Sequence, residues 1–251
     1  MFDSKVALIT GAATGMGRAC AEKLANDSFA IAANYRSKKD QVEAVLKSFA
    51  PGEHILVHGD IRDPDVPPLL IEEVVNKFGR LDVLINAAGT FSEHDISTIG
   101  YDKWLAAMKL NIETNLEGPM NLAFCAGQQM LKQGSGTIIN ITSRGAFRGE
   151  PDAPAYGANK AGLNSASQSL AKALAPSGIS VFAIAPGWVD TPLASQYLDS
   201  SASAAIKAQS PLNRVGTPQE IAEFVSFLAS GKAEYMTGAI IDMNGASYLR
   251  N

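Results

Sequence analysis

Short apolar runs alternate with longer amphipathic segments along the whole chain. The apolar runs are rich in Val and Ile and are apolar nearly throughout, which is typical of strands buried on both faces of a parallel sheet. They predict strands at residues 6–10, 30–34, 55–58, 83–86, 137–142, 180–185 and 239–243. The intervening segments have helical periodicity and predict helices at residues 17–26, 38–49, 67–78, 101–108, 115–133, 155–175 and 218–229. This alternation predicts an α/β fold, with one doubly wound parallel sheet of about seven strands and helices on both faces.

No linker, charge block or internal repeat divides the chain, so we predict a single domain over residues 1–251. One patch, residues 193–210, is rich in Ser and Ala and follows the sixth predicted strand. Ligands of α/β sheets bind at the carboxyl ends of the strands. We therefore expect this patch to be a mobile lid over a site, in preference to a tolerant surface loop.

Composition is that of a soluble globular protein, with 46% hydrophobic and 18% charged residues. No apolar run is long enough to span a bilayer. A strand-like run begins almost at once at the N-terminus, so we expect no secretory signal and a cytoplasmic location. The formal net charge is −4 and the basic residues are scattered, which argues against nucleic acid as a partner.

Cysteine and histidine positions do not suggest a metal site. Cys20 and Cys125 lie in helix-like segments, away from any CxxC motif or histidine, and we expect buried reduced thiols. His54, His58 and His94 lack metal-ligand spacing, and the first two flank a predicted strand, where an edge or surface position is expected.

Glycines gather where the first strand meets the first helix. The segment from Thr10 to Gly17 reads TGAATGMG, with glycine at 11, 15 and 17. Glycines at this junction let the backbone approach a pyrophosphate, which then lies on the helix N-terminus. The spacing is GxxxGxG rather than GxGxxG, and a tight turn without a ligand is the other interpretation. Its position directly after the first strand favours the dinucleotide.

Together with other motifs, this turn resembles the short-chain dehydrogenase/reductase family from Lys5 to about Tyr248. Residues 86–89 (NAAG) are similar to the family's NNAG segment with one Asn replaced by Ala, and residues 186–191 resemble its PG motif. The resemblance implies a nicotinamide dinucleotide, with Asp60 at the adenine and Thr191 at the carboxamide. The residues it implies around the cofactor are Gly11, Thr14, Gly15, Met16, Gly17, Tyr35, Arg36, Ser37, Asp60, Ile61, Asn86, Ala87, Ala88, Gly89, Tyr156, Lys160, Pro186, Gly187, Val189 and Thr191.

The end of the second strand bears on the choice between NADP(H) and NAD(H). An acid there would bind the ribose 2′-hydroxyl and repel a 2′-phosphate. Tyr35 stands where the family's NAD-type Asp would fall, and Arg36 can donate a fork of hydrogen bonds to phosphate. The other interpretation is that Arg36, Lys38 and Lys39 solvate an exposed loop, and Thr14 stands where many NADP-using relatives have a basic residue. We predict NADP(H), with NAD(H) as the alternative.

Tyr156 and Lys160 are four positions apart at the start of a predicted helix and therefore share one face. A free tyrosine titrates near pH ~10, and a nearby cation lowers that pKa. Ser143 ends a predicted strand thirteen positions before Tyr156, and its hydroxyl would hydrogen-bond the substrate oxygen. The resemblance implies that Tyr156 is the acid/base and that Lys160 also holds the nicotinamide ribose.

A fourth family residue, an Asn that supports a water relay, has two candidates. Asn111 lies seven positions after Trp104, as the family's WxxxxxxN pattern expects. Asn115 begins a segment similar to the NLxG motif and has the family's usual separation from Ser143. We choose Asn115, and expect Asn111 to be a helix surface residue.

These residues predict hydride transfer between NADP(H) and a carbonyl or secondary alcohol. The nearest resemblance is to 3-oxoacyl-(acyl carrier protein) reductases, through residues 112–116 and 211–218, which many sugar, steroid and small-ketone reductases share. An NAD-dependent sugar or alcohol dehydrogenase is the alternative, and a non-catalytic NADP(H) sensor is disfavoured because Ser, Tyr and Lys are all present. The family resemblance implies a homotetramer. Candidates for the small-molecule substrate pocket are Arg144, Phe147, Arg148, Glu150, Trp188 and residues 193–210, and for each of them a solvated loop or a packing role is the other interpretation.

Overall fold

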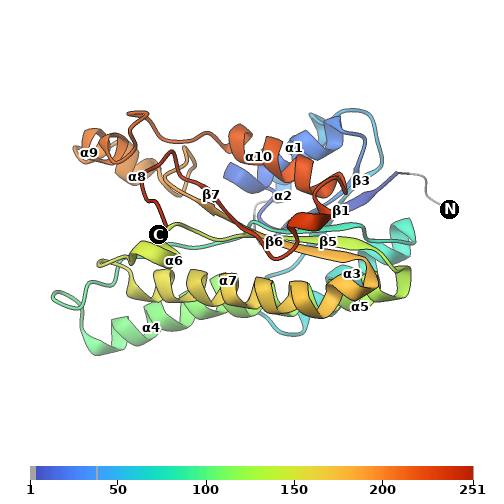
Figure 1. Ribbon diagram of the computed structural model, residues 1–251, viewed down its shortest axis with the longest axis horizontal. Coiled ribbons are helices and arrows are strands. Elements are labelled where there is room, and N and C mark those ends of the chain that lie inside the picture. The colour runs from blue at the N-terminus through green and yellow to red at the C-terminus, as the bar shows by residue number, and fades with distance from the viewer. Residues whose placement is uncertain (1–3, 38, 251) are drawn as a thin grey trace.

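The computed structural model describes residues 4–37 and 39–250 (Figure 1). Within them, seven strands form one sheet in the order β3-β2-β1-β4-β5-β6-β7, and each neighbouring pair is parallel. The strands are β1 (Val6–Ile9), β2 (Ala30–Tyr35), β3 (His54–His58), β4 (Val83–Asn86), β5 (Gly136–Ile141), β6 (Ile179–Pro186) and β7 (Ile240–Met243). Every predicted strand is present within one residue at either end, and the predicted doubly wound fold is confirmed.

Helices cover both faces of this sheet (Figure 1). One face carries α1 (Gly15–Asn26), α2 (Lys39–Lys47) and α10 (Pro218–Ala229). The other face carries α3 (Val66–Phe78), α5 (Gly118–Gln133) and α7 (Pro154–Leu174), with α4 (Tyr101–Ile112) packed beside α7. The shorter elements are η1 (Glu113–Glu117), α6 (Gly145–Arg148), η2 (Ala175–Ser177), α8 (Ser195–Leu198), α9 (Ser203–Ala208) and η3 (Glu234–Met236).

Two apolar cores lie on the two faces because successive strand side chains point to opposite sides. On β1, Ala7 and Ile9 join the core beneath α1 and α10, whereas Val6 and Leu8 join the core beneath α3 and α5. All four are fully buried, which explains why the strand sequence shows no polar alternation.

Strand order reverses between β1 and β4, and the crevice beyond such a switch point is where α/β sheets bind ligands. A side chain joins the two strand ends here. The Thr10 hydroxyl accepts hydrogen bonds from the backbone N–H groups of Ala87 and Ala88, each at 3.0 Å. The loops after β1 and β4 are therefore held at a fixed separation.

The helices differ from the prediction in two main places. The gap expected between helices at residues 109–114 is absent, because α4 continues through the π-helical η1 directly into α5. No Gly or Pro occurs at residues 109–114 to end the helix. Residues 193–210, where the sequence predicted a lid but no helix, contain α8 and α9. Residue 38, where the second predicted helix begins, lies outside the described residues.

The structure also tests the expectations for the histidines and cysteines. His54 and His58 lie on the edge strand β3, as expected. Both cysteines are free; Cys20 is buried, whereas Cys125 is partly exposed, contrary to expectation. Across the described ranges, no helix is long and apolar enough to cross a membrane, and no group of three or more His, Cys, Asp or Glu side chains could hold a metal ion.

Candidate active site

A groove of about 410 Å³ opens at the carboxyl ends of β1, β2 and β4. It collects most of the residues that the sequence predicted around a dinucleotide. Those lining it are Gly11, Thr14, Gly15, Met16, Gly17, Tyr35, Arg36, Ser37, Asp60, Ile61, Ala87, Ala88, Gly89, Tyr156, Lys160 and Thr191. Pro186, Gly187 and Val189 line the adjoining pocket instead.

The glycine turn packs against main-chain atoms so closely that it leaves no room for side chains at Gly11 and Gly17. Gly11 has φ of +67°, and a Cβ added to it would lie 3.0 Å from the Cα of Ala88. A Cβ on Gly17 would lie 2.4 Å from the carbonyl oxygen of Gly11. Thr14 at the N-cap of α1 makes no side-chain capping bond. The first N–H groups of α1 therefore remain available to an anion, and this turn fits the pyrophosphate of a dinucleotide.

Asn86 does not reach either cavity, although the sequence predicted it at the cofactor. It is 2% exposed, and its amide donates to the Pro119 carbonyl at 3.1 Å and to Asn140 Oδ1 at 2.8 Å. Asn140 in turn donates to Ser167 Oγ at 2.9 Å. This buried chain of hydrogen bonds ties β4 and β5 to α7, the helix that carries Tyr156, so Asn86 has a positioning role in the structure.

At the outer end of the groove, the Asp60 carboxylate is bound by Arg62, whereas the Arg36 guanidinium has only a distant contact with it. Arg62 Nε lies 3.0 Å from both carboxylate oxygens of Asp60, and this pairing holds the pKa of Asp60 below its usual range. Arg36 is 59% exposed at its side chain, and its Nη1 is 3.9 Å from Asp60 Oδ2. Because Asp60 is already bound by Arg62, most of the Arg36 guanidinium remains free to bind a phosphate.

Ser143, Tyr156 and Lys160 lie where the groove meets the adjoining pocket, with Lys160 lining the groove and Ser143 lining the pocket. Lys160 is 4% exposed, its Nζ donates to the Ile141 carbonyl at 2.8 Å, and it lies 5.8 Å from the centre of the Tyr156 ring. Ser143 Oγ accepts a hydrogen bond from the Gly145 backbone N–H at 3.0 Å. Tyr156 lines both the groove and the adjoining pocket, and is the point at which the two cavities join.

Burial dominates the ionisation of these groups. It raises the pKa of Tyr156, which the Ser143 hydrogen bond partly offsets and the charge of Glu150 reinforces. It also lowers the pKa of Lys160 to about 8. The sequence led us to expect a lowered Tyr156 pKa. The opposite direction arises because both groups share one desolvated site, where the charged form of each is disfavoured.

Asn111 and Asn115 form one buried network, so the expectation that Asn111 lies on the helix surface is wrong. Both are fully buried, and Asn115 Nδ2 donates to Asn111 Oδ1 at 3.1 Å and to the Thr90 carbonyl at 3.0 Å. A Cβ added to Gly89 would lie 3.2 Å from Asn115 Oδ1 and 3.7 Å from Lys160 Nζ. Asn115 is thus beside Lys160, while the catalytic role chosen for it stays a prediction.

His94 is a positioning residue that the sequence did not reveal. Its Nε2 accepts the Ala155 backbone N–H at 2.9 Å, while its Nδ1 lies 2.8 Å from the Ser92 carbonyl. These partners require the neutral tautomer with the proton on Nδ1. The ring therefore fixes the first turn of α7 beside Tyr156. No local motif signals this, because the partners are 61 positions apart.

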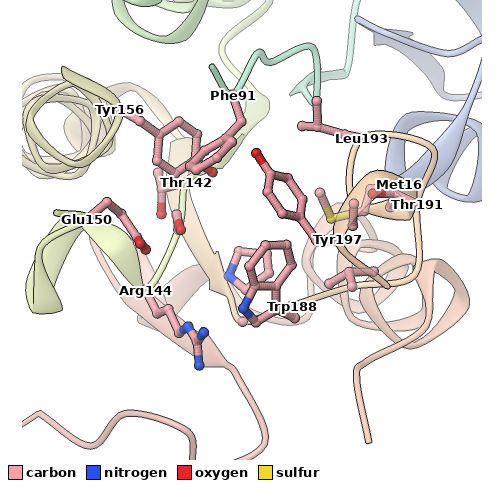
Figure 2. A pocket seen from close by; sticks show the side chains of 15 residues that line it. Met16, Phe91, Thr142, Arg144, Glu150, Tyr156, Trp188, Thr191, Leu193 and Tyr197 are labelled. Carbon is pink, nitrogen blue, oxygen red and sulfur yellow. The ribbon is translucent and has the colours of Figure 1, made fainter. Parts of the chain in front are cut away.

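Figure 2 shows the adjoining pocket, which has a volume of about 110 Å³ and is walled by aromatic rings. Phe91 packs on Tyr156 with ring centres 5.0 Å apart and on Tyr197 at 5.9 Å. Trp188 lies 5.4 Å from Tyr197. Of the substrate-pocket candidates, Arg144, Glu150 and Trp188 line this pocket, whereas Phe147 and Arg148 do not.

Comparisons with known proteins agree with this geometry. A family model described as enoyl-(acyl carrier protein) reductase matches residues 11–245. A 3-oxoacyl-(acyl carrier protein) reductase of Staphylococcus aureus is 38% identical over 98% of this chain and 99% of its own length. Its counterpart in Thermotoga maritima is 34% identical over 97% of this chain and 98% of its own length.

Solved structures agree as well. A variant of actinorhodin polyketide ketoreductase, crystallised with NADPH, has a TM-score of 0.90 at 30% identity, covering 98% of both chains. A dehydrogenase/reductase from Sinorhizobium meliloti has a TM-score of 0.88 at 29% identity, covering 98% of this chain and 95% of its own. The resemblance stated from the sequence motifs, including its nearest subgroup, is confirmed.

Proposed function

The chain belongs to the short-chain dehydrogenase/reductase family of nicotinamide-dependent oxidoreductases, and from this premise we propose that it reduces a ketone or 3-oxoacyl substrate with NADPH. One observation carries the proposal. Tyr156 lines both the dinucleotide groove and the aromatic pocket, with Ser143 and Lys160 beside it. A proton donor at that junction can reach a carbonyl in the pocket while hydride arrives from the groove.

The residues present can carry out each proton step. A bound nicotinamide cofactor supplies the hydride. The Ser143 hydroxyl hydrogen-bonds the substrate oxygen and stabilises the charge that develops there. Tyr156 donates its phenolic proton to that oxygen, and the Lys160 ammonium, close to the ring, stabilises the phenolate left behind. Asn115, in the buried network beside Lys160, supports the water relay that returns the proton to Tyr156.

The preference for NADPH rests on the groove's outer end. No acid occupies position 35, and Arg36 extends into solvent beside the groove with only a distant contact to Asp60. A guanidinium there favours a ribose 2′-phosphate, which a carboxylate would repel. The ketoreductase with the same fold binds NADPH in its crystal structure, which supports the same choice.

Residues 193–210 are proposed as the lid of the pocket. They supply Leu193, Ala194 and Tyr197 to its wall, and they contain two short helices of four and six residues, the first of which carries Tyr197. Such short helices carry little stability of their own, so the segment can move to admit substrate. The homotetramer remains a prediction from the family resemblance.

The first experiment measures the thermal shift of the protein with NADPH and with NADH, then the oxidation of each against ketones and 3-oxoacyl thioesters. We expect the larger shift with NADPH and turnover of at least one carbonyl. Tyr156→Phe is the control; its turnover should fall by about 10³-fold while the NADPH shift persists. Near-normal turnover by that variant, or no stabilisation by either nucleotide, would contradict the proposal.

A further inference from the structure

A buried cation lies in the wall of the aromatic pocket. Arg144 follows Ser143 directly in the chain, is 3% exposed, and lines the same pocket as Tyr156. Figure 2 shows it with Glu150 along the wall that adjoins Trp188. The backbone of Arg144 is fixed by an N–H bond to the Pro186 carbonyl at 3.0 Å, so the side chain is anchored at its base.

In the part of the chain that the structure describes, this guanidinium has no carboxylate within ion-pair distance. Its single side-chain hydrogen bond runs from Nη2 to the neutral amide oxygen of Gln209, at the end of α9. A guanidinium has five N–H donors, so several remain without a protein acceptor. Burial lowers the pKa of Arg144 to about 10, which still leaves it charged at neutral pH.

The nearest carboxylate is already neutralised. Glu150 lines the pocket, but Arg148 binds it with two hydrogen bonds, Nη2 to Oε2 at 2.9 Å and Nε to Oε1 at 3.3 Å. Arg144, Arg148 and Glu150 therefore leave one net positive charge at this wall. Burying an uncompensated cation is costly, and a ligand that brings the counter-charge recovers that cost.

Resting on the function proposed above, we propose that Arg144 binds a carboxylate of the substrate, so that the ketone reduced is an oxo acid with an apolar remainder. The planar guanidinium fork matches a carboxylate in a bidentate arrangement. Because Arg144 adjoins Ser143, which faces the carbonyl oxygen, the carboxylate lies only a few bonds from the carbonyl. Phe91, Trp188 and Tyr197 then pack against the apolar part of the substrate.

The test compares 2-, 3- and 4-oxohexanoate with their methyl esters as substrates for NADPH oxidation. We expect wild type to prefer at least one acid over its ester. Arg144→Met keeps most of the side-chain volume and should lower the acid-to-ester ratio of kcat/KM by about 30-fold, as expected for loss of a charge-assisted hydrogen-bonded pair. Arg144→Lys, which keeps the charge but loses the fork, should recover part of that ratio.

Gln209→Glu distinguishes binding of a substrate carboxylate by Arg144 from a purely structural role of Arg144 in holding the end of α9. The new carboxylate would strengthen such a tie, but it would also occupy the guanidinium and lower the acid-to-ester ratio. This variant keeps Arg144, so it remains informative if Arg144→Met does not fold. An acid-to-ester ratio that is unchanged in both variants, or a wild type that prefers every ester, overturns the inference.

Failure of the proposed function would look different. In that case no acid or ester would support NADPH oxidation. Calorimetric titration of the three oxo acids into the protein, both with and without NADP⁺, then decides the inference independently. Binding by wild type that is lost in Arg144→Met supports the carboxylate site, and no binding by wild type overturns it.

Discussion

The dinucleotide groove and the aromatic pocket share Tyr156 but are built in different ways. At its inner end, the groove is shaped by backbone, since Gly11 and Gly17 pack so closely that an added Cβ would meet main-chain atoms. The pocket is shaped by side chains, and Phe91, Trp188 and Tyr197 come from three separate segments. A site formed by one turn of backbone follows from a short motif, whereas a site formed by distant side chains depends on the whole fold.

This difference also predicts how the two sites respond to mutation. The groove is held by Thr10 and by the close packing of α1 on the strand ends, so it has one geometry. One wall of the pocket includes Tyr197 of α8, a helix of only four residues. Substitutions in the groove should affect every substrate alike, whereas substitutions in the pocket should change the order of preference among substrates.

Gly17→Ala should have the largest effect on the groove. Its Cβ would lie 2.4 Å from the Gly11 carbonyl oxygen, so the turn must shift. Overpacking of about 1–3 kcal/mol would weaken NADPH binding by roughly 5- to 150-fold, with the same fractional loss for every substrate. The control is Gly100→Ala, where nothing lies within 4 Å of the added Cβ. Equal NADPH affinities of the two variants by titration would contradict a groove built on backbone contact.

The next largest effect concerns the pH dependence of kcat/KM, which Lys160 should control through Tyr156, the residue that the groove and the pocket share. Burial lowers the pKa of Lys160 to about 8, so its ammonium is lost as pH rises through that value. The phenolate left on Tyr156 then has no neighbouring cation, and kcat/KM for reduction should fall about tenfold per pH unit above about 8. Pocket variants such as Trp188→Ala should keep the same pH midpoint. A flat profile up to pH ~10 would exclude Lys160 as the controlling group.

The same pKa has a consequence for stability with the opposite sign. The unfolded chain titrates Lys160 near its ordinary value of 10.5, so it binds more protons than the folded state between about 8 and 10.5. The Lys160 contribution to the free energy of unfolding should therefore rise with pH across that window. Chemical denaturation of the wild type and of Lys160→Met across this pH range measures the contribution. If Lys160 controls both properties, kcat/KM should fall while the free energy of unfolding rises as the pH increases above about 8.

The sequence predicted the groove better than the pocket for physical reasons. The strands and the glycine turn depend on local pattern, and all seven strands were placed within one residue at either end. The predicted helix end after residue 108 was wrong because periodicity alone does not show that η1 carries the helix onward. That continuation turns Asn111 inward to meet Asn115, 4 positions away, which explains why the expected surface position failed.

Long-range contacts account for what local pattern could not show. His94 supports Ala155 across 61 positions, and Arg144 meets Gln209 across 65. Asn86 matched a family motif, yet its side chain is directed into a buried hydrogen-bond network rather than the groove. Motif spacing reports which residues lie at a strand end; it does not report which way each side chain turns.

Arg36→Ala tests the outer end of the groove, with a smaller effect because the side chain is 59% exposed. Charge-assisted hydrogen bonds to a phosphate are weakened by solvent, so we expect NADPH affinity to fall about tenfold. NADH, which lacks the 2′-phosphate, should bind as in wild type. Lys47→Ala is the matched control, because Lys47 is 74% exposed but paired with Glu43 away from the groove. Equal losses for NADPH and NADH would exclude a 2′-phosphate contact.

Tyr197 should give the smallest effects and the clearest contrast with the groove. Its ring contacts Phe91 and Trp188, whereas its hydroxyl faces Glu93, and burial together with that carboxylate raises the pKa of Tyr197 to about 12. Tyr197→Phe keeps the ring and should change kcat/KM by less than about twofold, while Tyr197→Ala should lower it about fivefold for bulky ketones. For small ketones, kcat/KM should hardly change in Tyr197→Ala, because these substrates do not extend to the Tyr197 side of the pocket. If Tyr197→Ala instead lowered NADPH affinity, and lowered kcat/KM equally for all substrates, the pocket and the groove would not respond separately to mutation. Residues 193–210 would then contribute to cofactor binding.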